Sequence, residues 1–162
     1  MCADWKKHRS CTNSRCRCEE MSMPYRATRR VEFADTDMAG IMHFSRFFTL
    51  MEEVEHEWLR SRGLSVIMTW QGIKVGWPRV SAACEFYRPV FFEDLLAIEL
   101  SIERLGTKSI TFAAAFYRGD ECVARGQITT CCCRVNGPGD MTAMDIPNEI
   151  RDQLQAICVH TG

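Results

Sequence analysis

The hydrophobic pattern of this chain changes its period at Pro78, and this change limits the folds that the chain can adopt. Before Pro78, apolar residues in 44–62 recur every three or four positions, which is the spacing of a helix with one apolar face. After Pro78, apolar and polar residues alternate, as they do in strands. A helix with a broad apolar face needs another element to cover it. We therefore expect one sheet curled around one helix.

Short connections separate the strands that the alternation predicts. The predicted strands lie near 79–88, 95–104, 108–118 and 121–135. Connections this short join neighbouring antiparallel strands. Together with a strand at Arg29–Ala34, they predict an α+β fold in which about five antiparallel strands wrap around one long central helix.

The remaining segments are predicted from their glycine, proline and asparagine residues. Residues 64–77, which contain Gly72 and Gly76, are expected to be irregular. Asn136–Gly139 is expected to end the last strand, and 147–157 to form a short closing helix.

Size and charge exclude several classes of protein. A chain of 162 residues suggests a single domain, and a net charge of −1 gives no electrostatic reason to bind nucleic acid or an anionic membrane. No apolar run approaches the ~20 residues of a membrane span, and no signal peptide is found. We therefore expect a cytoplasmic protein, in which the ten cysteines are mostly small apolar residues.

Residues 1–24 differ from the rest of the chain, because they are polar, basic, rich in cysteine and without periodicity. We expect a disordered tail or a start-site artefact, with 25–162 forming the single domain. The motif Cys11-x4-Cys16-x-Cys18 fits no common zinc module, and no histidine pair follows it. No metal site and no cofactor are therefore predicted.

Asp35 and Asp37 lie directly before the predicted helix. One interpretation is that one or both cap the helix, because an aspartate accepts hydrogen bonds from its first free N–H groups. The other is that the loop presents a carboxylate beside those N–H groups, which could polarise a substrate carbonyl. Gly40 would then allow a substrate to approach the backbone, although it could equally be a turn glycine.

The run Val31–Phe44, followed by a helix through Glu52, resembles the signature of the 4-hydroxybenzoyl-CoA thioesterase family. The resemblance covers about residues 25–150, including the Pro78–Pro89 segment. It implies a hot-dog fold and hydrolysis of an acyl-CoA thioester to a free acid and CoA.

The resemblance also implies roles for residues of the loop. The catalytic aspartate of the family is the second of the pair, which here is Asp37. The backbone N–H of Phe44 would polarise the carbonyl, and Asp35 would support the loop. Whether Asp37 attacks the thioester or activates a water molecule is left open.

Substrate contacts are expected from His43, Trp77 and Lys108. His43 would line the pocket, although it could also act as a base or as a partly buried aromatic residue. Trp77 could wall the acyl pocket, or lie in the core or at a dimer interface. By the resemblance, Lys108 would contact a CoA phosphate; it could equally be an exposed turn lysine.

The helix also carries several glutamates. Glu52 matches a family glutamate and is expected to make a structural contact. Glu53, Glu55 and Glu57 are expected to form a solvated face.

Two other functions remain open. A dehydratase or hydratase on the same fold would use a different histidine–acid arrangement, and a non-catalytic module would bind an acyl-CoA or acyl carrier without cleaving it. In each case a lone curled sheet leaves edges to cover. By the resemblance, we expect a homodimer or homotetramer with active sites at the subunit boundary.

Overall fold

The computed structural model describes residues 24–155. The predicted tail and its cysteines, with Cys158, lie outside this range, apart from Pro24. The elements in chain order are β1 (Tyr25–Arg30), the 3-10 turn η2 (Phe33–Asp35), α1 (Phe44–Ser61), β2 (Ile67–Trp70), β3 (Ile73–Gly76), β4 (Arg79–Phe86), β5 (Leu95–Leu105), β6 (Ser109–Arg118), β7 (Glu121–Cys131), β8 (Cys133–Gly137), β9 (Asp140–Ala143) and α2 (Asn148–Gln155).

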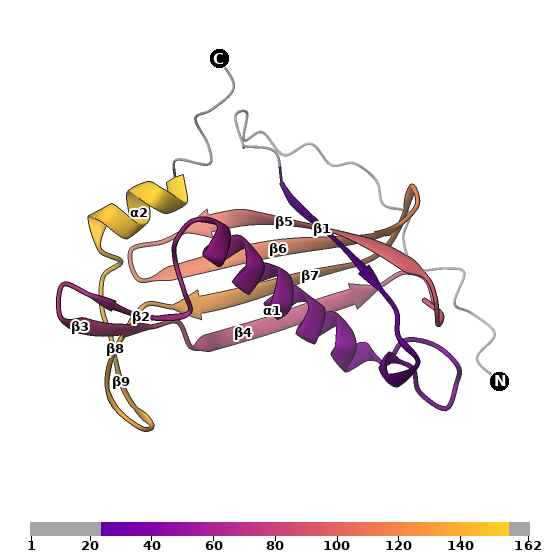
Figure 1. The fold of residues 1–162 in the computed structure, drawn as a ribbon, viewed down its shortest axis with the longest axis horizontal. Helices are drawn as coiled ribbons and strands as arrows, with labels where there is room; N and C mark the ends of the chain where they lie inside the picture. Colours follow the sequence, from indigo (N-terminus) through magenta and orange to yellow (C-terminus); the bar gives the residue numbers. More distant parts are fainter. Residues whose placement is uncertain (1–23, 156–162) are drawn as a thin grey trace, which may run out of the picture.

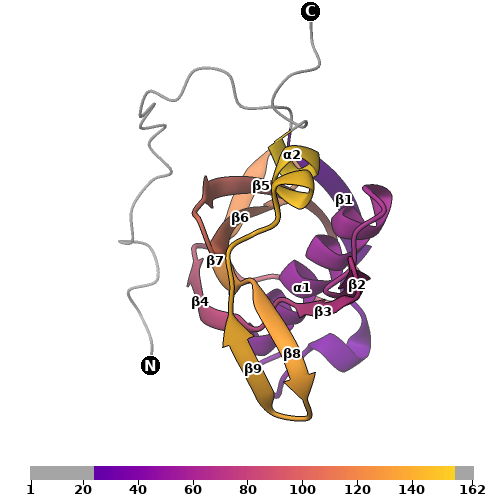
Figure 2. The ribbon, with the colours of Figure 1, turned by 90° about the vertical axis from the view of Figure 1, so that its left-hand side faces the viewer.

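A five-stranded antiparallel sheet in the order β1-β5-β6-β7-β4 carries α1 on one face (Figure 1). The end view shows that this sheet curves around the helix (Figure 2). A second sheet, in the order β2-β3-β8-β9, lies near the C-terminal end of α1. The predicted α+β fold, with one sheet wrapped around one long helix, is confirmed.

The core lies between α1 and the inner face of the large sheet. Every third or fourth residue of α1 is buried, among them Phe47, Met51, Val54 and Trp58. The rings of Phe47 and Trp58 pack edge-on against Phe116 and Phe112 of β6, at centroid distances of 5.2 and 5.6 Å. A side chain at Gly126 of β7 would clash with Met51, so the helix lies very close to the sheet.

The first strand lies earlier than predicted. Alternation suggested Arg29–Ala34, but β1 ends at Arg30 and the chain then turns through η2. Within this turn, the Asp35 side chain accepts the Glu32 N–H and the Glu32 carbonyl accepts the Asp35 N–H, both at 2.9 Å. These local hydrogen bonds take the place of the interstrand hydrogen bonds that the predicted strand would have made. Phe33 is left exposed.

Two further strand predictions were wrong. Residues 64–77 are not irregular, because β2 and β3 form a hairpin around Gln71 and Gly72, which both have positive φ as a tight two-residue turn requires. The predicted strand 121–135 is interrupted at Cys132, where the chain leaves the large sheet for the small one. Gly139, with φ of +75°, then turns the chain back into β9.

No helix within residues 24–155 is long and apolar enough to cross a membrane.

Candidate active site

Asp37 begins a small hairpin between η2 and α1. An antiparallel bridge joins Thr36 to Met42, and the Asp37 N–H donates to the Ile41 carbonyl at 2.9 Å. The Gly40 N–H returns to the Asp37 carbonyl at 2.9 Å, and Gly40 has a φ of +75°. In a three-residue hairpin loop, a turn is followed by one residue in the left-handed backbone conformation. Glycine adopts that conformation readily, so it is suited to position 40. We call residues 36–42 the Asp37 hairpin.

The Asp37 carboxylate is partly exposed. Its Oδ1 accepts the Ala39 N–H at 2.8 Å, which fixes the side chain against its own turn. Its Oδ2 has no hydrogen-bond partner, and no cation pairs with the carboxylate, among residues 24–155. A carboxylate that is held on one side and open on the other is available to a substrate or a water molecule.

Asp35 is buried and does not cap α1. Its carboxylate accepts the Glu32 N–H at 2.9 Å and the Arg46 Nε–H at 2.6 Å. Its carbonyl accepts the His43 N–H at 2.8 Å. Asp35 therefore ties η2 to the start of α1, which agrees with the supporting role expected for it.

The N-terminus of α1 is capped by His43. Its Nδ1 accepts the Ser45 N–H at 3.4 Å and lies 2.8 Å from Ser45 Oγ. The interpretation in which an aspartate caps this helix is therefore wrong. The N–H of Phe44, the first helical residue, has no hydrogen-bond partner in the described part of the chain. A free N–H at a helix N-terminus carries partial positive charge and can bind an oxyanion.

The capping bond also limits what His43 can do. Because Nδ1 accepts a hydrogen bond, we assign the proton of the neutral ring to Nε2. In this arrangement His43 can donate from Nε2 but cannot accept a proton there. The geometry therefore favours a substrate contact over a general base.

Large apolar side chains are exposed around the Asp37 hairpin. Met38 is on its turn, and Phe33 and Phe44 lie on either side of it in sequence. Phe91 and Phe92 come from the segment after β4, and the rings of Phe33 and Phe92 meet edge-on at 6.1 Å. An exposed apolar rim of this kind is typical of a surface that binds a ligand or another chain.

Trp77 belongs to the core. Only 6% of it is exposed, and its N–H donates to the Val66 carbonyl at 3.1 Å. Of the three alternatives for Trp77, the structure supports the core, and its part in the wall of the acyl pocket stays a prediction.

Lys108 lies far from Asp37 within one chain. It is exposed in the turn after β5, and its Nζ is 3.7 Å from Asp145 Oδ1. The Asp37 hairpin contacts the segment before β5, through the Met42 N–H and the Val90 carbonyl at 2.7 Å. The two sites are therefore at opposite ends of β5, which at roughly 3.3 Å per residue is about 30 Å long.

Sequence reasoning missed a polar cluster between α1 and β4. Glu55 is 1% exposed, so its expected place on a solvated face was wrong. Arg79 Nη2 donates to Glu55 Oε2 at 2.8 Å and lies 3.0 Å from His56 Nε2 and 3.3 Å from Glu52 Oε1. Glu52 thus makes the structural contact expected of it. The sequence does show an arginine directly after Trp77 and Pro78. Neither its spacing nor its charge predicts that it pairs with position 55.

Two cysteines of the sheets are poor nucleophiles. Burial raises the pKa of the Cys84 thiol to about 12 and that of Cys132 to about 11, which disfavours the reactive thiolate. Within 24–155, no group of three or more His, Cys, Asp and Glu side chains is arranged to hold a metal ion.

Known proteins resemble this chain along most of its length. A family model described as the thioesterase-like superfamily matches residues 31–154. A 1,4-dihydroxy-2-naphthoyl-CoA hydrolase from Nostoc punctiforme is 25% identical over 133 residues, or 82% of this chain and 88% of the relative. The crystal structure of a hypothetical protein from Aquifex aeolicus is 30% identical, with a TM-score of 0.70 over 81% of this chain and 99% of that one.

A crystal structure of a 4-hydroxybenzoyl-CoA thioesterase variant with 4-hydroxybenzoyl-CoA has a TM-score of 0.70 over 85% of this chain and 100% of that one. At 20% identity it supports the fold alone. The chain belongs to the thioesterase-like superfamily, and it is an enzyme of the thioester-hydrolase class.

Proposed function

We propose that this enzyme hydrolyses an acyl-CoA thioester to a free carboxylic acid and CoA, with Asp37 as the working carboxylate. One observation carries the proposal. The open side of a partly exposed carboxylate lies in a tight hairpin directly before a helix whose first N–H, that of Phe44, has no partner within residues 24–155.

The two groups divide the chemistry between them. The Phe44 N–H would donate to the thioester carbonyl oxygen and stabilise the negative charge that develops there. As a nucleophile, Asp37 would form an acyl anhydride with release of CoA thiolate, and water would then cleave the anhydride. As a general base, it would take a proton from the attacking water and return it to the departing thiolate. Gly40 holds the turn that places Asp37.

The acyl group proposed here is aromatic. The relative from Nostoc punctiforme is named for an aromatic acyl-CoA substrate, 1,4-dihydroxy-2-naphthoyl-CoA. The exposed rings of Phe33, Phe44 and Phe91 offer flat apolar contacts of the kind that aromatic groups prefer. His43 would donate from Nε2 to a polar group on the substrate.

A second copy of the chain is proposed to complete the site. A hollow of about 680 Å³ lies on the outer face of the large sheet, and none of the Asp37 hairpin lines it. β4 is an edge strand, and Val80 on it is 62% exposed. Antiparallel pairing of β4 with its copy would bring the Lys108 turn of one chain to the Asp37 end of the other. Lys108 would then bind a CoA phosphate as a point charge, in a homodimer or a homotetramer built from it.

A panel of aromatic, short-chain and long-chain acyl-CoAs, followed by release of free thiol, tests the proposal. We expect turnover, fastest with an aromatic acyl group. Binding of CoA without thiol release from any member would instead support a non-catalytic binding module. Loss of the double-bond absorbance of an enoyl-CoA, without thiol release, would support a hydratase.

A further inference from the structure

The segment between β4 and β5, residues 87–94, carries the loop that contains the Asp37 hairpin. The Val90 carbonyl accepts the Met42 N–H at 2.7 Å. At the other end of the loop, the Val31 carbonyl accepts the Glu93 N–H, and the Val31 N–H donates to the Asp94 carbonyl, both at 2.9 Å. The loop is therefore held at both ends by residues 90–94, and Val90 holds Met42, the residue that bridges to Thr36 beside Asp37.

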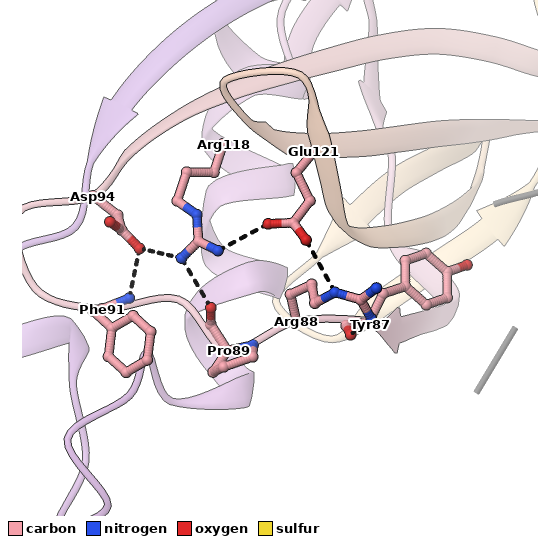
Figure 3. Close-up of polar contacts among 7 residues, drawn as sticks. All are labelled: Tyr87, Arg88, Pro89, Phe91, Asp94, Arg118 and Glu121. Atoms are coloured by element: carbon pink, nitrogen blue, oxygen red, sulfur yellow. Dashed lines mark hydrogen bonds and ion pairs between the residues drawn. The ribbon is translucent and has the colours of Figure 1, made fainter. Parts of the chain in front are cut away.

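Arg118 and Asp94 fix the residues on either side of Val90 (Figure 3). Arg118 Nη1 donates to the Pro89 carbonyl at 3.2 Å and to Asp94 Oδ2 at 2.9 Å. The same Asp94 oxygen accepts the Phe91 N–H at 2.9 Å. Pro89 before Val90 and Phe91 after it are thus both bonded to one ion pair, which sets the direction of the Val90 carbonyl.

The ion pair is extended toward the β6–β7 turn by a weaker one. Arg118 Nη2 donates to Glu121 Oε2 at 2.9 Å, and Arg88 Nε donates to Glu121 Oε1 at 3.0 Å. The Arg88 and Glu121 side chains are about half exposed, so their pair contributes little to stability. Arg118 and Asp94 are less exposed, and of the four side chains in this network only theirs bond to the backbone of Pro89 and Phe91.

The charges of this network argue against a substrate site. Two arginines face two carboxylates, and each guanidinium already has a carboxylate partner. No net positive charge is left for a CoA phosphate. Arg118 and Asp94 instead bond to backbone atoms of residues 87–94, as side chains that support a loop do.

We propose that Asp94 and Arg118 are positioning residues for the reaction. By fixing the Val90 carbonyl, they set the place of Met42, and through the Thr36–Met42 bridge they set the place of Asp37. The proposal rests on the proposed catalytic role of Asp37. A misplacement of about 1 Å at a reacting group can slow a reaction on the order of 10²-fold, so a support three contacts away can control kcat.

The test compares Arg118→Gln with Arg88→Gln, a matched control in the same network whose side chain, within residues 24–155, contacts Glu121 and the Tyr87 carbonyl. Hydrogen exchange at the Met42 amide reports the Val90 contact directly. We expect Arg118→Gln to raise this exchange rate roughly 10-fold or more and to lower kcat by about 10- to 100-fold with little change in KM. Arg88→Gln should match the wild type in both. Arg118→Lys, which keeps the charge but has one nitrogen in place of the two that bind Pro89, Asp94 and Glu121, should fall between them.

A role in stability alone would lower the melting temperature without moving kcat of the folded protein. In the Asp37→Asn background, Arg118→Gln should have no further effect on the residual rate, since the group that it positions is gone. Wild-type exchange at Met42, or equal kcat values for Arg118→Gln and Arg88→Gln, would overturn the proposal. Absence of thioesterase activity in the wild type would reject the proposed function instead, and the exchange arm would still report whether Arg118 holds the loop.

Discussion

Burial changes the acidity of the Glu55 carboxyl. Its carboxyl is almost fully buried, and burial raises its pKa to about 7, despite the nearby Arg79 guanidinium. The unfolded chain should have an ordinary glutamate, with a pKa near 4.5. The folded protein therefore binds more protons than the unfolded chain between these two values, and the free energy of unfolding falls as the pH rises through that range.

We expect Glu55→Gln to remove this dependence. Urea unfolding at pH 5 and pH 8 should show that the wild type loses on the order of 1–3 kcal/mol relative to Glu55→Gln over that range. His56 and Glu52 face the same arginine, and burial lowers the pKa of His56, which acts in the opposite direction below its ordinary value. Comparison with the variant cancels this contribution. Glu53→Gln, at an exposed position of α1, should follow the wild type, and parallel curves for wild type and Glu55→Gln would contradict the account.

Individual residues were predicted unevenly from the sequence. Asp35, Asp37 and Gly40 stood out because they are close together in the chain and their local bonding determines their place. Trp77 and Glu55 could not be placed, because their burial depends on how β3, β4 and α1 meet. Arg118 gave no signal at all, since its partners Pro89 and Asp94 are more than twenty positions away.

At the level of elements, α1 was predicted almost to the residue, because its apolar spacing and the glycine after it are local features. The Asp37 hairpin was expected only as a loop. Its closure depends on the bridge from Thr36 to Met42 and on the Val90 contact, which no short pattern encodes. The β2–β3 hairpin was missed because Gln71 is an unusual residue for a turn with positive φ.

The N-terminal cap of α1 offers a test at this scale. His43→Ala removes the acceptor for the Ser45 N–H, and we expect it to lower the free energy of unfolding by about 1 kcal/mol. His43→Asn keeps a capping oxygen and should remain within a few tenths of a kcal/mol of the wild type. Chemical denaturation of the three proteins measures this. An alanine variant as stable as the wild type would mean that the histidine does not cap the helix.

The whole molecule combines a large sheet around α1 with a small sheet beside its end. The large sheet could be predicted, because short turns between alternating segments leave few other topologies. The crossing at Cys132 could not, since both halves of 121–135 alternate and nothing local marks the change of sheet. The free edge at β4 is a consequence of strand order, and it is the feature on which the proposed dimer depends.

A charge on this edge should prevent self-association. We expect Val80→Lys to shift the protein from dimer or tetramer to monomer in sedimentation or light-scattering measurements, because a lysine on an edge strand opposes edge-to-edge pairing. Met141→Lys replaces an exposed apolar side chain on β9 and should leave the oligomer intact. An oligomer unchanged by Val80→Lys, or a wild type that is monomeric at every concentration, would contradict pairing through β4.

The most direct measurement is thiol release by Asp37→Asn with the acyl-CoA that the wild type cleaves fastest. Asparagine keeps the oxygen that accepts the Ala39 N–H, so the hairpin, the circular dichroism spectrum and CoA binding should be preserved. Loss of the negative charge should lower kcat by roughly 10²–10⁴-fold. A variant that folds, binds CoA and still releases thiol at the wild-type rate would show that Asp37 is not the working carboxylate.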